Sequence, residues 1–271
     1  MKEILMIDYK NVLNSTKFKV ISFIIFSIPI IGFLLSCKFY YGLPENFIRS
    51  SLEENFLFGM VCRHLKLWFI LLLPILSMIL CSDIYIEQYK NGVYKYILTK
   101  TSKTNYIISK IIVVFTITFS VVFVSLLISQ VLFCITFPIN GLDNARALPS
   151  FDIGYLNYSE TNFLDLLRLK NRFLYNIAFY GIFALISALY SIISLSISFF
   201  IKKSKISIVF SFIIFLGIYI AFMTLGLQEY HLNYYLDGYN KGNIFFYEWL
   251  LFLVSISFIL SILKLKFNDE I

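Results

Sequence analysis

The sequence predicts an all-α membrane protein with six transmembrane helices. The chain has 271 residues, of which 59% are hydrophobic and only 14% are charged, and its mean hydropathy is +0.80. A soluble domain could not cover its surface with so few polar residues. The apolar residues gather in six runs, each near the length of about 20 residues that a helix needs to cross a bilayer. The runs are 20–36, 67–81, 111–138, 173–201, 206–227 and 245–263.

Helices are expected in these runs because lipid offers no partner for unpaired backbone groups. Ahead of the first run, the segment 1–19 has the pattern of an amphipathic helix, with Ile4, Leu5, Tyr9, Val12 and Leu13 on one face. Such a helix lies in the membrane interface. An ordinary cytosolic cap is the alternative interpretation of this segment.

The distribution of charge predicts the orientation. The termini and the two even-numbered connections carry 14 Lys against 6 acidic residues, whereas the odd-numbered connections carry 9 basic against 10 acidic residues. Basic residues favour the cytoplasmic side, so both termini, including the tail 265–271, are predicted in the cytoplasm of a plasma-membrane protein. The net charge of +7 follows from topology and does not indicate nucleic-acid binding. The predicted outer loops are 37–66, 139–172 and 228–244.

The connection 83–110 is polar and patterned, although a simple link between two spans needs only about five residues. Asn91 and Gly92 form a turn or helix-stop signal. Residues 93–98 then predict a short amphipathic helix with Lys95 and Lys100 on its polar side and with exposed tyrosines and aliphatic residues, followed by a polar connector over 99–105. Such a helix is suited to docking a protein, or to resting on anionic lipid headgroups.

Residues 87–98 read Glu-Gln-Tyr-Lys-Asn-Gly-Val-Tyr-Lys-Tyr-Ile-Leu, and Lys110 opens the next span. This stretch resembles the loop between the second and third spans in the permease subunits of type-two ATP-binding-cassette exporters. Val93 stands where that family usually has Thr, and the family's Pro near Thr101 is missing, which leaves the end of the coupling helix open. The resemblance implies that 1–19 is an elbow helix and assigns ATPase coupling to Glu87, Lys90, Gly92, Val93, Tyr94, Tyr96, Ile97, Leu98, Thr99 and Lys103.

Two further segments carry a pattern. In the fourth span, small residues at spacings of three and four form a stripe suited to close helix packing; they are Ala184, Ala188, Ser191, Ser194 and Ser198. The tyrosine-rich segment 228–235 resembles the short re-entrant helices of the same permeases, and an aromatic interfacial belt is the alternative. The longer outer loops either shape substrate release or are tolerated insertions.

The sequence does not predict a catalytic or metal site. His64 and His231 lie far apart with no carboxylate at a ligand-like spacing, and no phosphate-binding loop of the G-x-x-x-x-G-K-[ST] type is present. Cys37 and Cys62 flank the first outer loop, where isolated thiols are favoured over a bridge. The chain is therefore expected to bind no cofactor, and ATP and Mg²⁺ would be bound by a partner ATPase.

These observations predict the permease subunit of an ATP-driven exporter. The span interiors hold almost no ionisable residues, and a proton-coupled carrier would need them. The cargo is thus expected to be amphipathic or apolar: a hydrophobic or antimicrobial peptide, a lipid-linked molecule or a drug. The expected partners are ABC ATPase subunits, a second permease copy or a related permease, and the lipid bilayer. The alternatives are a carrier or channel without ATP, and a membrane sensor or assembly subunit that does not transport.

Overall fold

The computed structural model describes residues 2–44, 48–81, 84–138, 164–201, 203–236 and 245–267. Within these ranges the regular elements are helices, six of which are long and apolar enough to cross a membrane. The predicted fold class is therefore confirmed. The spans are α2 (Thr16–Tyr40), α3 (Arg63–Cys81), α6 (Lys103–Thr136), α9 (Arg172–Ser198), α10 (Ser204–Thr224) and α12 (Phe245–Phe267).

Most helices extend beyond the runs that hydropathy marks. The largest difference is in α6, which begins at Lys103, eight residues ahead of the predicted run 111–138. Hydropathy marks only the part of a helix that suits hydrocarbon, and the first turns of α6 instead pack against other helices of the chain. The segment 1–19 also divides differently, because Ser15 caps α2 by accepting a hydrogen bond from the Phe18 amide, which separates α1 (Lys2–Asn14) from α2.

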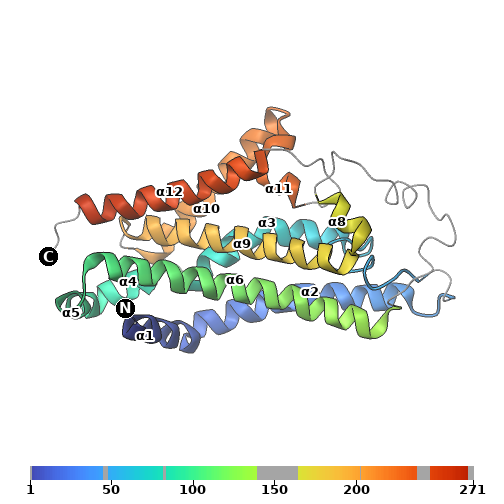
Figure 1. Cartoon of the computed structure of the whole chain (residues 1–271), viewed down its shortest axis with the longest axis horizontal. Helices are drawn as coiled ribbons and strands as arrows, with labels where there is room; N and C mark the ends of the chain where they lie inside the picture. The colour runs from blue at the N-terminus through green and yellow to red at the C-terminus, as the bar shows by residue number, and fades with distance from the viewer. Residues whose placement is uncertain are drawn as a thin grey trace.

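Both ends of the described chain lie at the same end of the bundle (Figure 1). Helix α1, α4 (Ile84–Lys90), α5 (Val93–Lys100) and the last turn of α12 gather there, and α8 (Asp165–Lys170) lies toward the opposite end. An even number of crossings requires this arrangement. We refer to the two ends as the α5 end and the α8 end.

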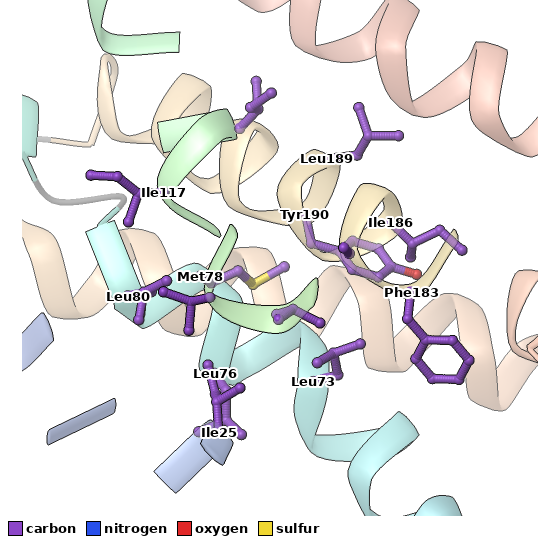
Figure 2. Close-up of a cluster of buried hydrophobic side chains, with 14 of the residues drawn as sticks. Ile25, Leu73, Leu76, Met78, Leu80, Ile117, Phe183, Ile186, Leu189 and Tyr190 are labelled. Atoms are coloured by element: carbon purple, nitrogen blue, oxygen red, sulfur yellow. The ribbon is translucent and has the colours of Figure 1, made fainter. Parts of the chain in front are cut away.

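Helices α3 and α9 form the centre of the bundle. Helix α9 contacts α3, α6, α10 and α12, and Figure 2 shows Leu76 of α3 and Ile186 of α9 within a cluster that also takes Ile25 from α2 and Ile117 from α6. In contrast, α10 and α12 expose long apolar faces. Such faces are expected of helices that meet lipid or another membrane chain.

The stripe of small residues lies on the enclosed part of α9. Ala184, Ala188, Ser191, Ser194 and Ser198 are each no more than 1% exposed. Helix α10 approaches this stripe through its own serines, since the Ser207 hydroxyl donates a hydrogen bond to the Ser194 carbonyl oxygen at 3.3 Å. Small side chains at such a contact allow helix backbones to pack closely.

The predicted outer loop 37–66 is only partly exposed in the residues that the structure describes. Its part 48–62 folds back into the α8 end of the bundle, where Phe56 and Leu57 are each 1% exposed. Phe56 lies so close to Gly32 of α2 that a Cβ atom there would meet its ring at 2.7 Å. This part of the predicted loop therefore contributes to the packed interior of the bundle. The predicted outer loops at 139–163 and 237–244 lie outside the described residues.

Candidate coupling site

Helices α4 and α5 form a hairpin between the second and third spans. Gly92 joins them with φ of 69°, a left-handed conformation that favours glycine over residues with a Cβ atom. Helix α5 runs to Lys100, and α6 starts at Lys103 after Ser102, whose hydroxyl accepts a hydrogen bond from the Asn105 amide. The predicted connector over 99–105 is therefore wrong, because only residues 101 and 102 separate the helices.

The two faces of α5 have different environments. Tyr94 and Ile97 are only 8% and 7% exposed, and Tyr94 stacks on Tyr89 of α4 with 4.9 Å between the ring centroids. Tyr96, in contrast, is 63% exposed. The expectation that all tyrosines and aliphatic residues of this helix are exposed is wrong for Tyr94 and Ile97. The apolar side of a short amphipathic helix packs on its own protein, which leaves a narrower surface for a partner.

That surface, which we name the docking face, consists of the exposed residues Val93, Lys95, Tyr96, Thr99 and Lys100. The Lys100 ammonium lies 4.7 Å from the centre of the Tyr96 ring. The other predicted coupling residues lie elsewhere: Leu98 packs against the core, and Glu87 forms an ion pair with Lys17 of α2 at 3.1 Å. Lys90 ends α4, and Lys103 starts α6.

A buried ion pair holds the hairpin to the rest of the bundle. The Lys110 ammonium of α6 donates to both carboxylate oxygens of Asp8 in α1, at 2.5 and 2.6 Å, and neither side chain is exposed. Gln88 of α4 donates to the same carboxylate at 2.7 Å, and the Tyr106 hydroxyl donates to the Gln88 side-chain oxygen at 2.9 Å. We name Asp8, Gln88, Tyr106 and Lys110 the clamp. It joins α1, α4 and α6.

The clamp connects the docking face with the spans. Buried charges lose hydration, so they are stable only when paired and hydrogen-bonded, and here each has such partners. The clamp therefore attaches α4 to α1 and to the start of α6. Lys110 belongs to the stretch that resembles the permease family, but no role was predicted for Asp8. The signal was present, because Asp8 lies between Ile4 and Val12 on the apolar face of α1, where an acidic residue requires a partner.

A second polar cluster lies within the spans near the α8 end. Gln130 of α6 donates to the Ser51 carbonyl oxygen at 3.0 Å and accepts from the Tyr180 hydroxyl of α9 at 2.5 Å. Asn176 of α9 donates to the Leu52 carbonyl oxygen at 3.1 Å. Side chains of two spans thus satisfy backbone carbonyls of the folded-back segment, as burial in a membrane requires. This cluster was not predicted, because amide and hydroxyl groups are uncharged and do not interrupt the hydropathy of a span.

The same segment places a carboxylate among hydroxyl groups. Glu54 is buried and accepts hydrogen bonds from Tyr40 at 3.1 Å and from Ser36 at 3.4 Å. Burial raises the pKa of Glu54 above its ordinary value, and the hydrogen bond from Tyr40 opposes this shift. Cys62 lies beside Ser36, and both Cys37 and Cys62 are free thiols.

A cavity of about 530 Å³ lies between the start of α3, the end of α10 and the segment after α10. The tyrosine-rich segment forms a short 3₁₀ helix, η2 (Gln228–Tyr230), and a single α-helical turn, α11 (Leu232–Tyr235). His64 and His231, distant in sequence, both line the cavity, together with Lys66. His231 is 4% exposed, and its Nδ1 atom accepts a hydrogen bond from the Asn233 amide at 3.1 Å.

The burial of His231 predicts that the stability of the segment 228–235 depends on pH. Burial lowers the pKa of His231 from 6.5 to about 4, so the unfolded chain binds more protons between these values and stability falls as the pH decreases through this window. The melting temperature of the detergent-solubilised chain, followed by tryptophan fluorescence, is expected to show this fall, and His231→Gln should reduce it. His64→Gln, at the exposed histidine of the same cavity, is the control. A fall that is equal in both variants would contradict the assignment to His231.

Six candidate spans with a helical hairpin between the second and third define a multi-pass membrane protein. The chain matches the family model described as ABC-2 family transporter protein over residues 15–155, slightly more than half of its length. It belongs to this family and is a permease subunit of an ABC transporter. The match includes α2 to α6 and thus the whole docking face. Comparisons with curated proteins and with solved structures gave no match.

Proposed function

We propose that the chain is the membrane half of an exporter in the plasma membrane, driven by separate ATPase subunits that bind the docking face from the cytoplasm. The observation that carries this proposal is the exposure of Tyr96 on a helix whose opposite side is anchored to the protein. An exposed aromatic residue on a rigid element offers contact area at a low entropic cost, as interface hot spots do. Family membership supports the ATPase partner, since ABC-2 permeases belong to ABC transporter systems.

The proposed mechanism runs through the hairpin. A nucleotide bound to the ATPase can move the spans only if some element is contacted differently in the two states. Helix α5 is that element in our proposal. Its displacement passes through Gln88 to the Asp8 carboxylate, and from there to α1 and Lys110 of α6. ATP and Mg²⁺ would be bound by the ATPase and not by this chain.

The proposed cargo is amphipathic or apolar and leaves the cell through a pathway built by two permease chains. The outward faces of α10 support such a pairing, because Ile206, Val209 and Ile213 are each at least half exposed. The Lys110 ammonium and the Gln130 amide, which lie in α6, are both hydrogen-bonded to partners within the chain. An apolar pathway favours a hydrophobic or antimicrobial peptide, a lipid-linked molecule or a drug over a hydrophilic ion.

The proposal is tested by affinity purification of the tagged chain from its native membrane in mild detergent, with mass spectrometry of the chains that co-purify. We expect a soluble chain that carries a G-x-x-x-x-G-K-[ST] phosphate loop. Co-purification without any nucleotide-binding chain would contradict the proposal and favour a sensor or assembly subunit. A tagged, unrelated membrane protein of the same cells is the control for contamination.

A further inference from the structure

A second cavity, of about 730 Å³, lies at the α5 end of the bundle. Four lysines from three separate parts of the chain line it: the start of α2, the end of α4 and the start of α10. Isoleucines of α3 and α10, among them Ile75, Ile79 and Ile208, form its apolar wall. The lysines are Lys17, Lys90, Lys203 and Lys205.

The charge of this cavity is strongly positive. None of the described residues that line it is acidic. The nearby carboxylate of Glu87 is paired with Lys17 at 3.1 Å, and Lys90, Lys203 and Lys205 all have exposed side chains. The preference for lysine on the cytoplasmic side explains why such residues flank the spans. It does not explain why those of three separate segments converge on one hollow beside an apolar wall.

We propose that this cavity binds the phosphate-bearing headgroup of an anionic membrane lipid, whose acyl chains lie along the isoleucines of α3 and α10. Each lysine ammonium has three donors for phosphate oxygens, and basic pockets between membrane helices suit anionic headgroups. The apolar wall favours a lipid over a free anion, because acyl chains can pack against it. A lipid in this position contacts both the start of α10 and Lys90. Lys90 lies two residues before Gly92, the residue that precedes α5. This inference does not depend on the proposed function.

The test compares two variants with the same change in charge. In Lys90→Gln/Lys203→Gln/Lys205→Gln the cavity loses three charges, whereas Lys2→Gln/Lys10→Gln/Lys19→Gln removes three exposed charges of α1 and α2 outside it. Native mass spectrometry of the detergent-purified chains counts bound phosphatidylglycerol against phosphatidylcholine. We expect the preference for phosphatidylglycerol to fall at least about tenfold in the cavity variant, because each lysine contributes appreciably to anionic-lipid binding, and to stay nearly unchanged in the other.

Two results of this comparison would overturn the inference. Equal losses in both variants would show diffuse surface attraction, and no loss in either would show that the cavity does not select the lipid. A third sample tests the source of the phosphate, with glycerol 3-phosphate added in large excess. We expect it to leave phosphatidylglycerol bound, since it lacks acyl chains, and displacement would assign the cavity to a free anion instead. The melting temperatures of both variants should match that of the wild type, because the substituted side chains are exposed.

Discussion

Replacing Lys110 with methionine is expected to destabilise the chain by about 3–5 kcal/mol. The substitution removes the cation of the clamp and leaves the Asp8 carboxylate buried, with Gln88 as its remaining polar partner. An uncompensated charge in a buried site is far more costly than the loss of a surface ion pair. The free energy of unfolding in mild detergent, measured with a denaturant and followed by tryptophan fluorescence, gives the magnitude.

The matched control is the double variant Asp8→Asn/Lys110→Met. It removes both charges and keeps an amide oxygen that can accept from Gln88, and replacing both members of a buried pair is often nearly neutral. We therefore expect it to recover most of the stability lost in Lys110→Met. If the double variant is as unstable as the single one, or if Lys110→Met unfolds like the wild type, the clamp does not hold α1 to the bundle as described.

Replacing Tyr96 with aspartate is expected to abolish coupling to the ATPase while leaving the fold intact. Tyr96 is 63% exposed, so the free energy of unfolding should change by no more than about 0.5 kcal/mol. Aspartate removes the aromatic contact area of the docking face and places an acidic group at its centre. In the co-purification described above, the nucleotide-binding chain should be reduced at least about tenfold, as for the loss of an interface hot spot.

Two variants separate binding from folding in this experiment. Tyr41→Asp makes the same change just after the last residue of α2, toward the α8 end of the bundle, where the tyrosine is 89% exposed. It should leave the ATPase bound. Tyr94→Asp is expected to lower stability, because Tyr94 is buried against Tyr89. An intact complex with Tyr96→Asp would contradict the proposal that the docking face binds the ATPase. This holds even if Tyr94→Asp abolished the complex, because Tyr94→Asp also lowers stability.

The sequence predicted the features that depend only on a single helix and on whether water or lipid surrounds it. The six spans followed from the length and hydropathy of each run, and Gly92 followed from the need for a left-handed residue between α4 and α5. The short helix after Gly92 was also predicted, because its amphipathic pattern is local. The clamp was not, since the partner of Asp8 is 102 residues away and only the packing of α1 on α6 brings the two together.

Which of the predicted coupling residues are buried and which are exposed also depends on tertiary packing. An amphipathic pattern separates Tyr94 and Ile97 from Lys95 and Lys100, but it does not indicate whether the apolar side faces a partner or the chain itself. The burial of the folded-back segment 48–62 was not predicted either, because it depends on contacts with residues that are distant in sequence. Its backbone carbonyl oxygens accept hydrogen bonds from Gln130 of α6 and Asn176 of α9, and uncharged amides do not stand out within an apolar run.

The most direct test of the central claim places a photo-reactive group on the docking face. With Tyr96→p-benzoylphenylalanine, irradiation of intact membranes should cross-link the chain to a soluble nucleotide-binding subunit. The same substitution at Tyr41, which is also strongly exposed, is the control and should give no such cross-link. That result would show that α5 contacts the ATPase. A cross-link from position 96 to lipid alone, or to a chain without a phosphate loop, would contradict the account.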